Sequence, residues 1–201
     1  MLFEVFFDVE TKKLFSDVGS ENPADLGVSI VSVYSRIVDW EGNELEGAMK
    51  SFWERELGNM WELFEKADRI IGFNTLKFDI PALAPYAPSH FGTLPHFDLF
   101  AKVAEVVGRK LSLYTLARDT LGHTKTDNGL HAVQYFANGD AESLGKLRKY
   151  CEADVLITRD LYDFGIHEKH LKYMDKWNRK TTIPIDFSYP KEFTQKQIGL
   201  F

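Results

Sequence analysis

Carboxylic acids stand within apolar sequence at three separate places in this chain. The first is FDVET, in which Asp8 and Glu10 are two residues apart in a stretch typical of a β-strand. Because side chains alternate between the two faces of a strand, both carboxylates are expected on one face. Neighbouring carboxylates are costly to bury unless a cation neutralises them. The pair therefore suits a metal site, and a solvated strand face is the alternative.

The second and third places each put one acid beside a strand or on a helix. In GFNTLKFD, Asn74 follows a short apolar strand and Asp79 comes five residues later, before Pro81. An acid in so apolar a run indicates a functional role, and the alternative is an N-cap for a helix that contains Pro81. In YCEADV, Tyr150 and Asp154 are four residues apart and share a helix face. The alternative is an ordinary amphipathic helix with a Tyr–Asp hydrogen bond.

The elements that must position these residues follow from hydrophobic periodicity and turn residues. Strands are predicted over 2–9, 27–38, 69–73 and 94–97, with a hairpin turn around Gly42 and a loop over 11–26. Helices are predicted over 57–67, from Asp98 to about 107, and over 112–121, 129–137 and 142–164. Residues 169–187 are expected to pair as a hairpin. This order of elements predicts an α/β domain with a mixed sheet.

Composition and charge limit the classes of protein to which this chain can belong. The 201 residues are 44% hydrophobic and carry a formal charge of −6, which argues against a protein that coats nucleic acid by bulk electrostatics but allows a nuclease. No apolar run approaches the ~20 residues that span a membrane. The acidic start argues against a secretion signal. Cys151 is the sole cysteine, which rules out an internal disulfide or a Cys-based zinc site. A cytoplasmic protein is expected.

The three acidic segments, in this order and spacing, resemble the motifs of the DEDD exonuclease superfamily in its tyrosine-containing subgroup. Within it, the chain is most similar to the proofreading exonuclease domain of family-B DNA polymerases. The resemblance covers about residues 1–165 and implies a ribonuclease H-like fold, with a mixed central β-sheet flanked by helices. The histidine-containing subgroup would carry His where Lys149 stands.

The resemblance also implies an activity and a set of catalytic residues. Asp8, Glu10, Asp79 and Asp154 match the metal-binding acids, and Tyr150 matches the tyrosine that orients the attacking water. Two Mg²⁺ or Mn²⁺ ions are implied, and hard cations of this kind prefer oxygen ligands. The expected reaction is 3′→5′ hydrolysis of single-stranded DNA, which releases nucleoside 5′-monophosphates during replication or repair.

Further residues are candidates for contact with the substrate. Thr11 and Phe78, together with Phe73, are expected to bound the terminal nucleotide, and Asn74 matches a substrate-contacting position. Lys125 and His123 lie in a loop that can reach phosphate. For all of these a purely structural role is the alternative, and Asp98 is expected to start a helix.

Two segments near the C-terminus suggest partners. Residues 167–180 mix Lys and Arg with aromatic residues, which suits a single-stranded backbone or, alternatively, a solvated hairpin. We expect the exonuclease domain to span residues 1–188 and an extended tail to span 189–201. The tail resembles peptides that dock bacterial sliding clamps, except at Gly199; folding back onto the domain is the alternative. Its candidate contact residues are Gln197, Ile198, Leu200 and Phe201.

Two rival functions remain from the sequence. The same site can act on RNA 3′ ends, because nothing in the sequence reveals how a 2′-hydroxyl is read. A non-catalytic nucleic-acid-binding or clamp-binding module on the same fold is the second rival. The presence of all five catalytic-type residues argues against that module.

Overall fold

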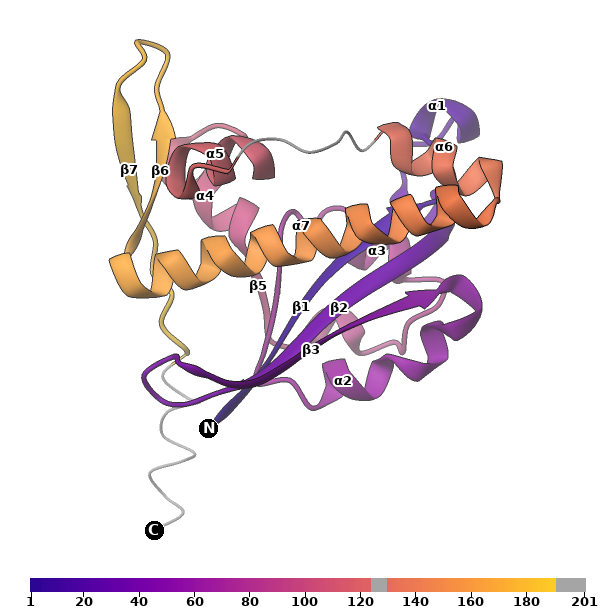
Figure 1. Ribbon diagram of the computed structural model, residues 1–201, viewed down its shortest axis with the longest axis horizontal. Coiled ribbons are helices and arrows are strands. Elements are labelled where there is room, and N and C mark those ends of the chain that lie inside the picture. Colours follow the sequence, from indigo (N-terminus) through magenta and orange to yellow (C-terminus); the bar gives the residue numbers. More distant parts are fainter. Residues whose placement is uncertain (124–129, 191–201) are drawn as a thin grey trace.

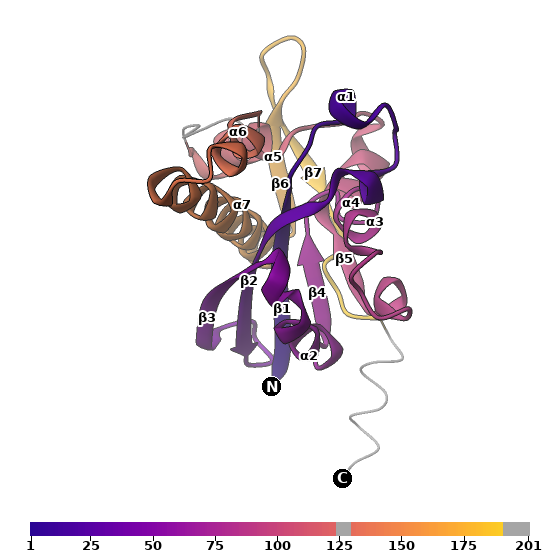
Figure 2. The same ribbon diagram turned by 90° about the vertical axis from the view of Figure 1, so that its right-hand side faces the viewer.

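A five-stranded mixed sheet forms the centre of the protein in the computed structural model, which describes residues 1–123 and 130–190 (Figure 1). The strands are β1 (Leu2–Thr11), β2 (Val28–Val38), β3 (Glu44–Trp53), β4 (Arg69–Gly72) and β5 (His96–Asp98). They lie in the order β3-β2-β1-β4-β5, which Figure 2 shows from the side. Strands β1, β2 and β3 pair antiparallel, whereas β4 runs parallel to β1 and β5 parallel to β4. The predicted α/β fold with a mixed sheet is confirmed.

The central strand β1 contributes to the two larger hydrophobic cores because its residues alternate in direction. Val5, Phe7 and Val9 pack with the segment that follows β3 and with the helix after β4. Phe6 lies in the other core, against Tyr162 of the longest helix. Asp8 and Glu10 continue the Phe6 side of the strand, so β1 turns its acids toward that long helix.

Helices cover both faces of the sheet. The bounds of these helices are α1 (Phe15–Val18), α2 (Trp61–Glu65), α3 (Asp79–Leu83), α4 (Leu99–Val107), α5 (Leu113–Leu121), α6 (Leu130–Asn138) and α7 (Ala141–Glu168). Three 3₁₀ turns add η1 (Pro23–Leu26), η2 (Glu54–Asn59) and η3 (Phe91–Thr93). Helix α7 crosses the sheet along much of the length of the molecule (Figure 1). Within the described residues, no helix has both the length and the apolarity needed to cross a lipid bilayer.

Two predicted elements differ in detail from the structure. The predicted helix over 57–67 is divided into η2 and α2, because Leu57 and Met60 both enter the core at the three-residue spacing of a 3₁₀ turn. The predicted loop over 11–26 contains α1 and η1, and the Asn22 side chain accepts a hydrogen bond from the Ala24 N–H at the start of η1. Neither difference moves a candidate site residue.

A two-stranded antiparallel hairpin follows α7, as the sequence predicts. It consists of β6 (His170–Met174) and β7 (Lys180–Pro184). The chain then returns to the sheet, where Ile185 and Phe187 are buried. Arg69 donates hydrogen bonds to the carbonyl oxygens of Phe187 and Ser188, at 2.7 and 2.6 Å. These contacts fasten the chain after the hairpin to the N-terminal end of β4.

Candidate active site

Asp8 and Glu10 occupy the C-terminal part of β1, beside α7. Both residues are half-buried, and the intervening Val9 points into the opposite core. The pairing of β1 with β2 changes register between Glu10 and Thr11, so the regular ladder ends just past the two acids. The expectation that both carboxylates share one face agrees with this geometry.

Helix α7 brings Asp154 to the two acids on β1. Carboxylate oxygens of Asp8, Glu10 and Asp154 lie within 4.8 Å of one another. Asp154 is buried, and the adjacent Val155 packs in the core that also contains Phe6. Tyr150 lies one turn earlier on the same helix, as the spacing predicts, and is half-buried beside Asp154.

Asp79, from the helix that follows β4, contacts the backbone of β1 beside the two acids. Its carboxylate accepts a hydrogen bond from the backbone N–H of Val9, at 2.9 Å, and it is 3% exposed. Asp79 is the first residue of α3, and Phe78 occupies the N-cap position. The alternative of an N-cap role for Asp79 is therefore wrong. The side chain instead contacts the backbone between Asp8 and Glu10.

The loop that carries Asn74 is held by Asp98, at the end of β5. The Asp98 carboxylate accepts hydrogen bonds from the backbone N–H groups of Asn74 (2.8 Å) and Leu76 (3.0 Å). The same carboxylate caps α4 by accepting from the Ala101 N–H at 3.2 Å. Asn74 adopts a left-handed conformation with φ of 67°. Asp98 thus has the structural role expected of it, and it shapes the loop that leads to Asp79.

Two residues at the cluster were not anticipated from the sequence. Tyr114 of α5 donates a hydrogen bond to Asp154 and is hydrogen-bonded to Tyr150. Cys151 is fully buried, with its Sγ donating toward the backbone oxygen of Asp8 (3.5 Å) and its Oδ2 (3.6 Å). Both contacts join segments far apart in the chain, so local spacing carried no signal for them.

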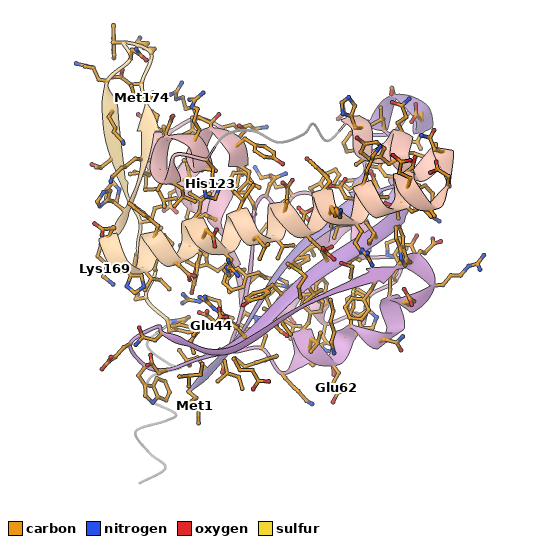
Figure 3. All side chains as sticks on the ribbon, in the orientation of Figure 1. Met1, Glu44, Glu62, His123, Lys169 and Met174 are labelled. Atoms are coloured by element: carbon orange, nitrogen blue, oxygen red, sulfur yellow. The ribbon has the colours of Figure 1, made fainter. Side chains whose placement is uncertain are left out.

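The remaining candidate residues differ in their contacts and in their exposure to solvent. Phe78 packs edge-on against Phe15, with ring centroids 6.2 Å apart. Thr11 is buried, and its hydroxyl donates to the Lys13 carbonyl. His123 is exposed after α5 (Figure 3). Other candidates lie outside the described residues: Lys125, Gln197, Ile198, Leu200 and Phe201.

The sequence as a whole agrees with this architecture. Residues 5–165 match the family model of the RNase_H superfamily. The chain belongs to the RNase H superfamily. A similar solved structure is that of the family B DNA polymerase from the hyperthermophilic archaeon Pyrobaculum calidifontis, with a TM-score of 0.59 and 20% identity over 83% of this chain. The chain spans 25% of that polymerase chain, and the likeness is one of fold. No match was found among curated protein sequences.

Burial raises the pKa of each acid at this RNase H-like site, and repulsion between neighbouring carboxylates adds to it for Asp8 and Glu10. Burial, and then the charges of Glu10, Asp79 and Asp154, hold the pKa of Asp8 well above its ordinary value. Burial and the charge of Asp154 do the same to the pKa of Glu10. Burial raises the pKa of Asp79 to about 8, and it raises the pKa of Asp154 to about 6 despite hydrogen bonds from Tyr114 and Tyr150. A bound cation would relieve this repulsion.

The donor atoms of the cluster fit a hard divalent cation. Carboxylate oxygens are the ligands that Mg²⁺ and Mn²⁺ prefer. The nearby Cys151 thiol has its pKa raised by burial and by the charge of Asp8, which keeps it a hydrogen-bond donor instead of a thiolate ligand. The residues present therefore match a magnesium or manganese site better than a thiolate zinc site.

Proposed function

We propose that this protein is a metal-dependent 3′→5′ exonuclease that acts on single-stranded DNA. The proposal rests on one observation: carboxylates from β1 and α7 lie within 4.8 Å of one another, while Asp79 from α3 contacts the backbone of the same strand. The RNase H fold and the likeness to a DNA polymerase support a nuclease. The products would be nucleoside 5′-monophosphates, and the setting would be DNA replication or repair.

Each acid and Tyr150 would have a distinct part in the reaction. Asp8, Glu10, Asp79 and Asp154 would hold two Mg²⁺ or Mn²⁺ ions. When bound, such ions stabilise developing negative charge and make water a better nucleophile near neutral pH. The Tyr150 hydroxyl would orient a water for attack on the terminal phosphodiester. The P–O3′ bond then breaks, and the preceding nucleotide keeps its 3′ oxygen.

Aromatic and polar groups beside the acids would position the terminal nucleotide. Phe78 and Phe15 form an edge-on pair next to Asp79, and an aromatic face there can stack on a base. Thr11 follows Glu10 directly, and Asn74 begins the loop that leads to α3. We assign Thr11, Asn74 and Phe78 to substrate positioning, because Thr11 and Phe78 adjoin Glu10 and Asp79 in the chain and Asn74 begins the loop between β4 and α3.

The test uses 5′-labelled single-stranded DNA and its RNA counterpart, with Mg²⁺, Mn²⁺ or EDTA. Wild-type protein should shorten DNA stepwise from the 3′ end only when metal is present. Glu10→Gln should lower the rate by on the order of 10²-fold or more, because it removes one charge that stabilises the reacting centre. Glu105→Gln, an exposed position on α4, is the matched control and should retain wild-type activity.

Several outcomes would contradict the proposal. Intact substrates under every metal condition would favour a binding module, and internal cuts would indicate an endonuclease. Faster shortening of RNA than of DNA would assign the same site to an exoribonuclease. Equal loss of activity in Glu10→Gln and Glu105→Gln would refute the assigned site.

A further inference from the structure

The β6–β7 hairpin concentrates positive charge in an acidic protein. It projects beyond the sheet and helices, at the upper left in Figure 1, and Figure 3 marks Lys169 at its base and Met174 at the end of β6. The whole chain has a formal charge of −6, but residues 169–180 contain a single acid, Asp175. The basic residues of this segment are Lys169, Lys172, Lys176, Arg179 and Lys180.

The hairpin tip presents a tryptophan between two cations. Trp177 is 64% exposed, and its ring centroid lies 4.3 Å from Lys176 Nζ and 4.7 Å from Arg179 Cζ. An aromatic face beside positive charge is the combination that binds a base and its phosphates together.

The turn that carries Trp177 is held in one shape by Asp175. Its carboxylate accepts hydrogen bonds from the backbone N–H groups of Trp177 (2.8 Å) and Arg179 (2.9 Å), and from Arg179 Nε (2.9 Å). The backbone N–H of Asp175 also donates to the Arg179 carbonyl, at 2.9 Å. Asp175 is therefore engaged within the turn, and the exposed ring needs little ordering before it binds.

Helix α5 connects the hairpin to the acidic cluster. The Asp119 carboxylate accepts from the Met174 N–H at 2.8 Å, and the Thr120 hydroxyl bonds to both backbone groups of Lys172 at 2.9 Å. At the other end of α5, Tyr114 donates to Asp154. The path along α5 and up the hairpin to Trp177 is about 20 Å, from the rise per residue of a helix and a strand. That length corresponds to about six nucleotides of stacked single strand.

We propose that the hairpin tip binds the single strand upstream of the 3′ end that occupies the acidic cluster. Trp177 stacks on a base, while Lys176 and Arg179 contact the phosphates on either side of it. The direction of the bound strand rests on the proposed function, because the acidic cluster defines where the 3′ end lies. The ligand class is a single-stranded nucleic acid long enough to span from the cluster to the tip.

The test measures binding of 5′-fluorescein oligothymidylates by anisotropy, in an Asp8→Asn background with Mg²⁺ so that the strand is not cut. Trp177→Ala should weaken the binding of a strand of about 20 nucleotides by about 10-fold, the effect of losing one stacked base, and leave a strand of about four unchanged. Replacement of both Lys176 and Arg179 by Gln should also reduce the dependence of binding on salt. The matched control is Trp40→Ala, since Trp40 is 63% exposed in the turn between β2 and β3.

The result separates the hairpin from the proposed activity. Unchanged binding of the long strand by Trp177→Ala, or equal losses for Trp177→Ala and Trp40→Ala, would overturn the hairpin surface even in an active exonuclease. Equal weakening of the short strand would overturn it too, because that strand cannot reach the tip. A loss confined to Trp177→Ala and the long strand supports the surface even if the protein cuts no substrate.

Discussion

Tyr114 and Tyr150 reach the same carboxylate from different helices. Tyr114 donates to Asp154, and the two phenols are hydrogen-bonded to each other. Removal of one hydrogen bond to a charged group costs about 1.5–3 kcal/mol. Tyr114 acts through Asp154 and Tyr150 and is therefore a positioning residue.

Tyr114→Phe should lower kcat about tenfold, with the KM for DNA nearly unchanged, and should weaken Mn²⁺ binding. Steady-state kinetics and calorimetric Mn²⁺ titration measure these effects. Tyr173→Phe, which removes a hydroxyl from β6, is the matched control. An increase in KM at constant kcat, or the same kinetics in both variants, would contradict this role.

The raised pKa values make the stability of the metal-free protein depend on pH. Asp79 (pKa about 8) and Asp154 (about 6) keep protons in the folded state that the unfolded chain has already released. The free energy of unfolding should therefore fall as pH rises above about 4, up to about pH 6 for Asp154 and about pH 8 for Asp79, by up to about 1.4 kcal/mol per pH unit for each group. Asp39 and Asp119 have lowered pKa values, so they ionise below this window.

Thermal unfolding with and without Mg²⁺ checks this pH dependence. The metal should raise Tm more at about pH 8 than at about pH 5, because more of the acids are ionised and repelling one another. Asp79→Asn should flatten the metal-free profile between these values. A metal-free Tm that rises with pH over the same range would contradict the expected sign.

At the scale of the elements, the Asp98 side chain anchors the loop between β4 and α3. Asp98 accepts from the backbone of Asn74, Leu76 and Ala101, so it holds both this loop and α4. Asp98→Ala should destabilise the protein by about 3 kcal/mol and lower activity, because Asp79 loses its support. Urea unfolding and the exonuclease assay measure the two effects.

The control for Asp98 is Asp140, which caps α7 by accepting from the Ser143 N–H at 2.9 Å. Asp140→Ala should cost about 1 kcal/mol and leave activity in place, because its cap lies more than two turns before Tyr150. Full activity in Asp98→Ala would show that the loop does not need this anchor to place Asp79.

Local periodicity predicts the elements and the faces on which the acids lie, because it acts within a strand or a helix turn. Asp8 with Glu10, and Tyr150 with Asp154, are examples. It does not predict contacts between distant segments. The bond between Val9 and Asp79 spans 70 residues, and that between Tyr114 and Asp154 spans 40. Such contacts arise only when the whole sheet and its helices pack.

At the scale of the whole molecule, a network of buried charges joins separate segments of the chain at the end of the sheet opposite Asp8 and Glu10. Glu4 and Arg36 pair at 2.8 Å, and each side chain is 2% exposed. Arg36 also pairs with Asp163 of α7, while Tyr162 and Tyr189 both donate to Glu4. The network ties the N-terminal strand to α7 and to the segment after the hairpin.

Glu4→Ala should destabilise the protein by about 3–5 kcal/mol, because it takes one of two close carboxylate partners from the buried Arg36 and the acceptor from the Tyr162 and Tyr189 hydroxyls. Glu62→Ala breaks an exposed pair with Lys66 on α2 and should change the free energy of unfolding by under about 0.5 kcal/mol. Urea unfolding of both variants compares the costs. Equal effects would show that the buried network does not contribute more than a surface pair.

Alkylation of Cys151, the single thiol of the chain, can report how often α7 and β1 separate at the site. Cys151 is sealed between α7 and the backbone of Asp8, so an alkylating reagent reaches it only when helix and strand part. The rate of alkylation at constant pH therefore reports how readily the helix and the strand separate, without any engineered label. A ligand that bridges Asp8 and Asp154 should slow the alkylation of Cys151. The ratio of the alkylation rates without and with the ligand gives the free energy with which that ligand holds the two segments together.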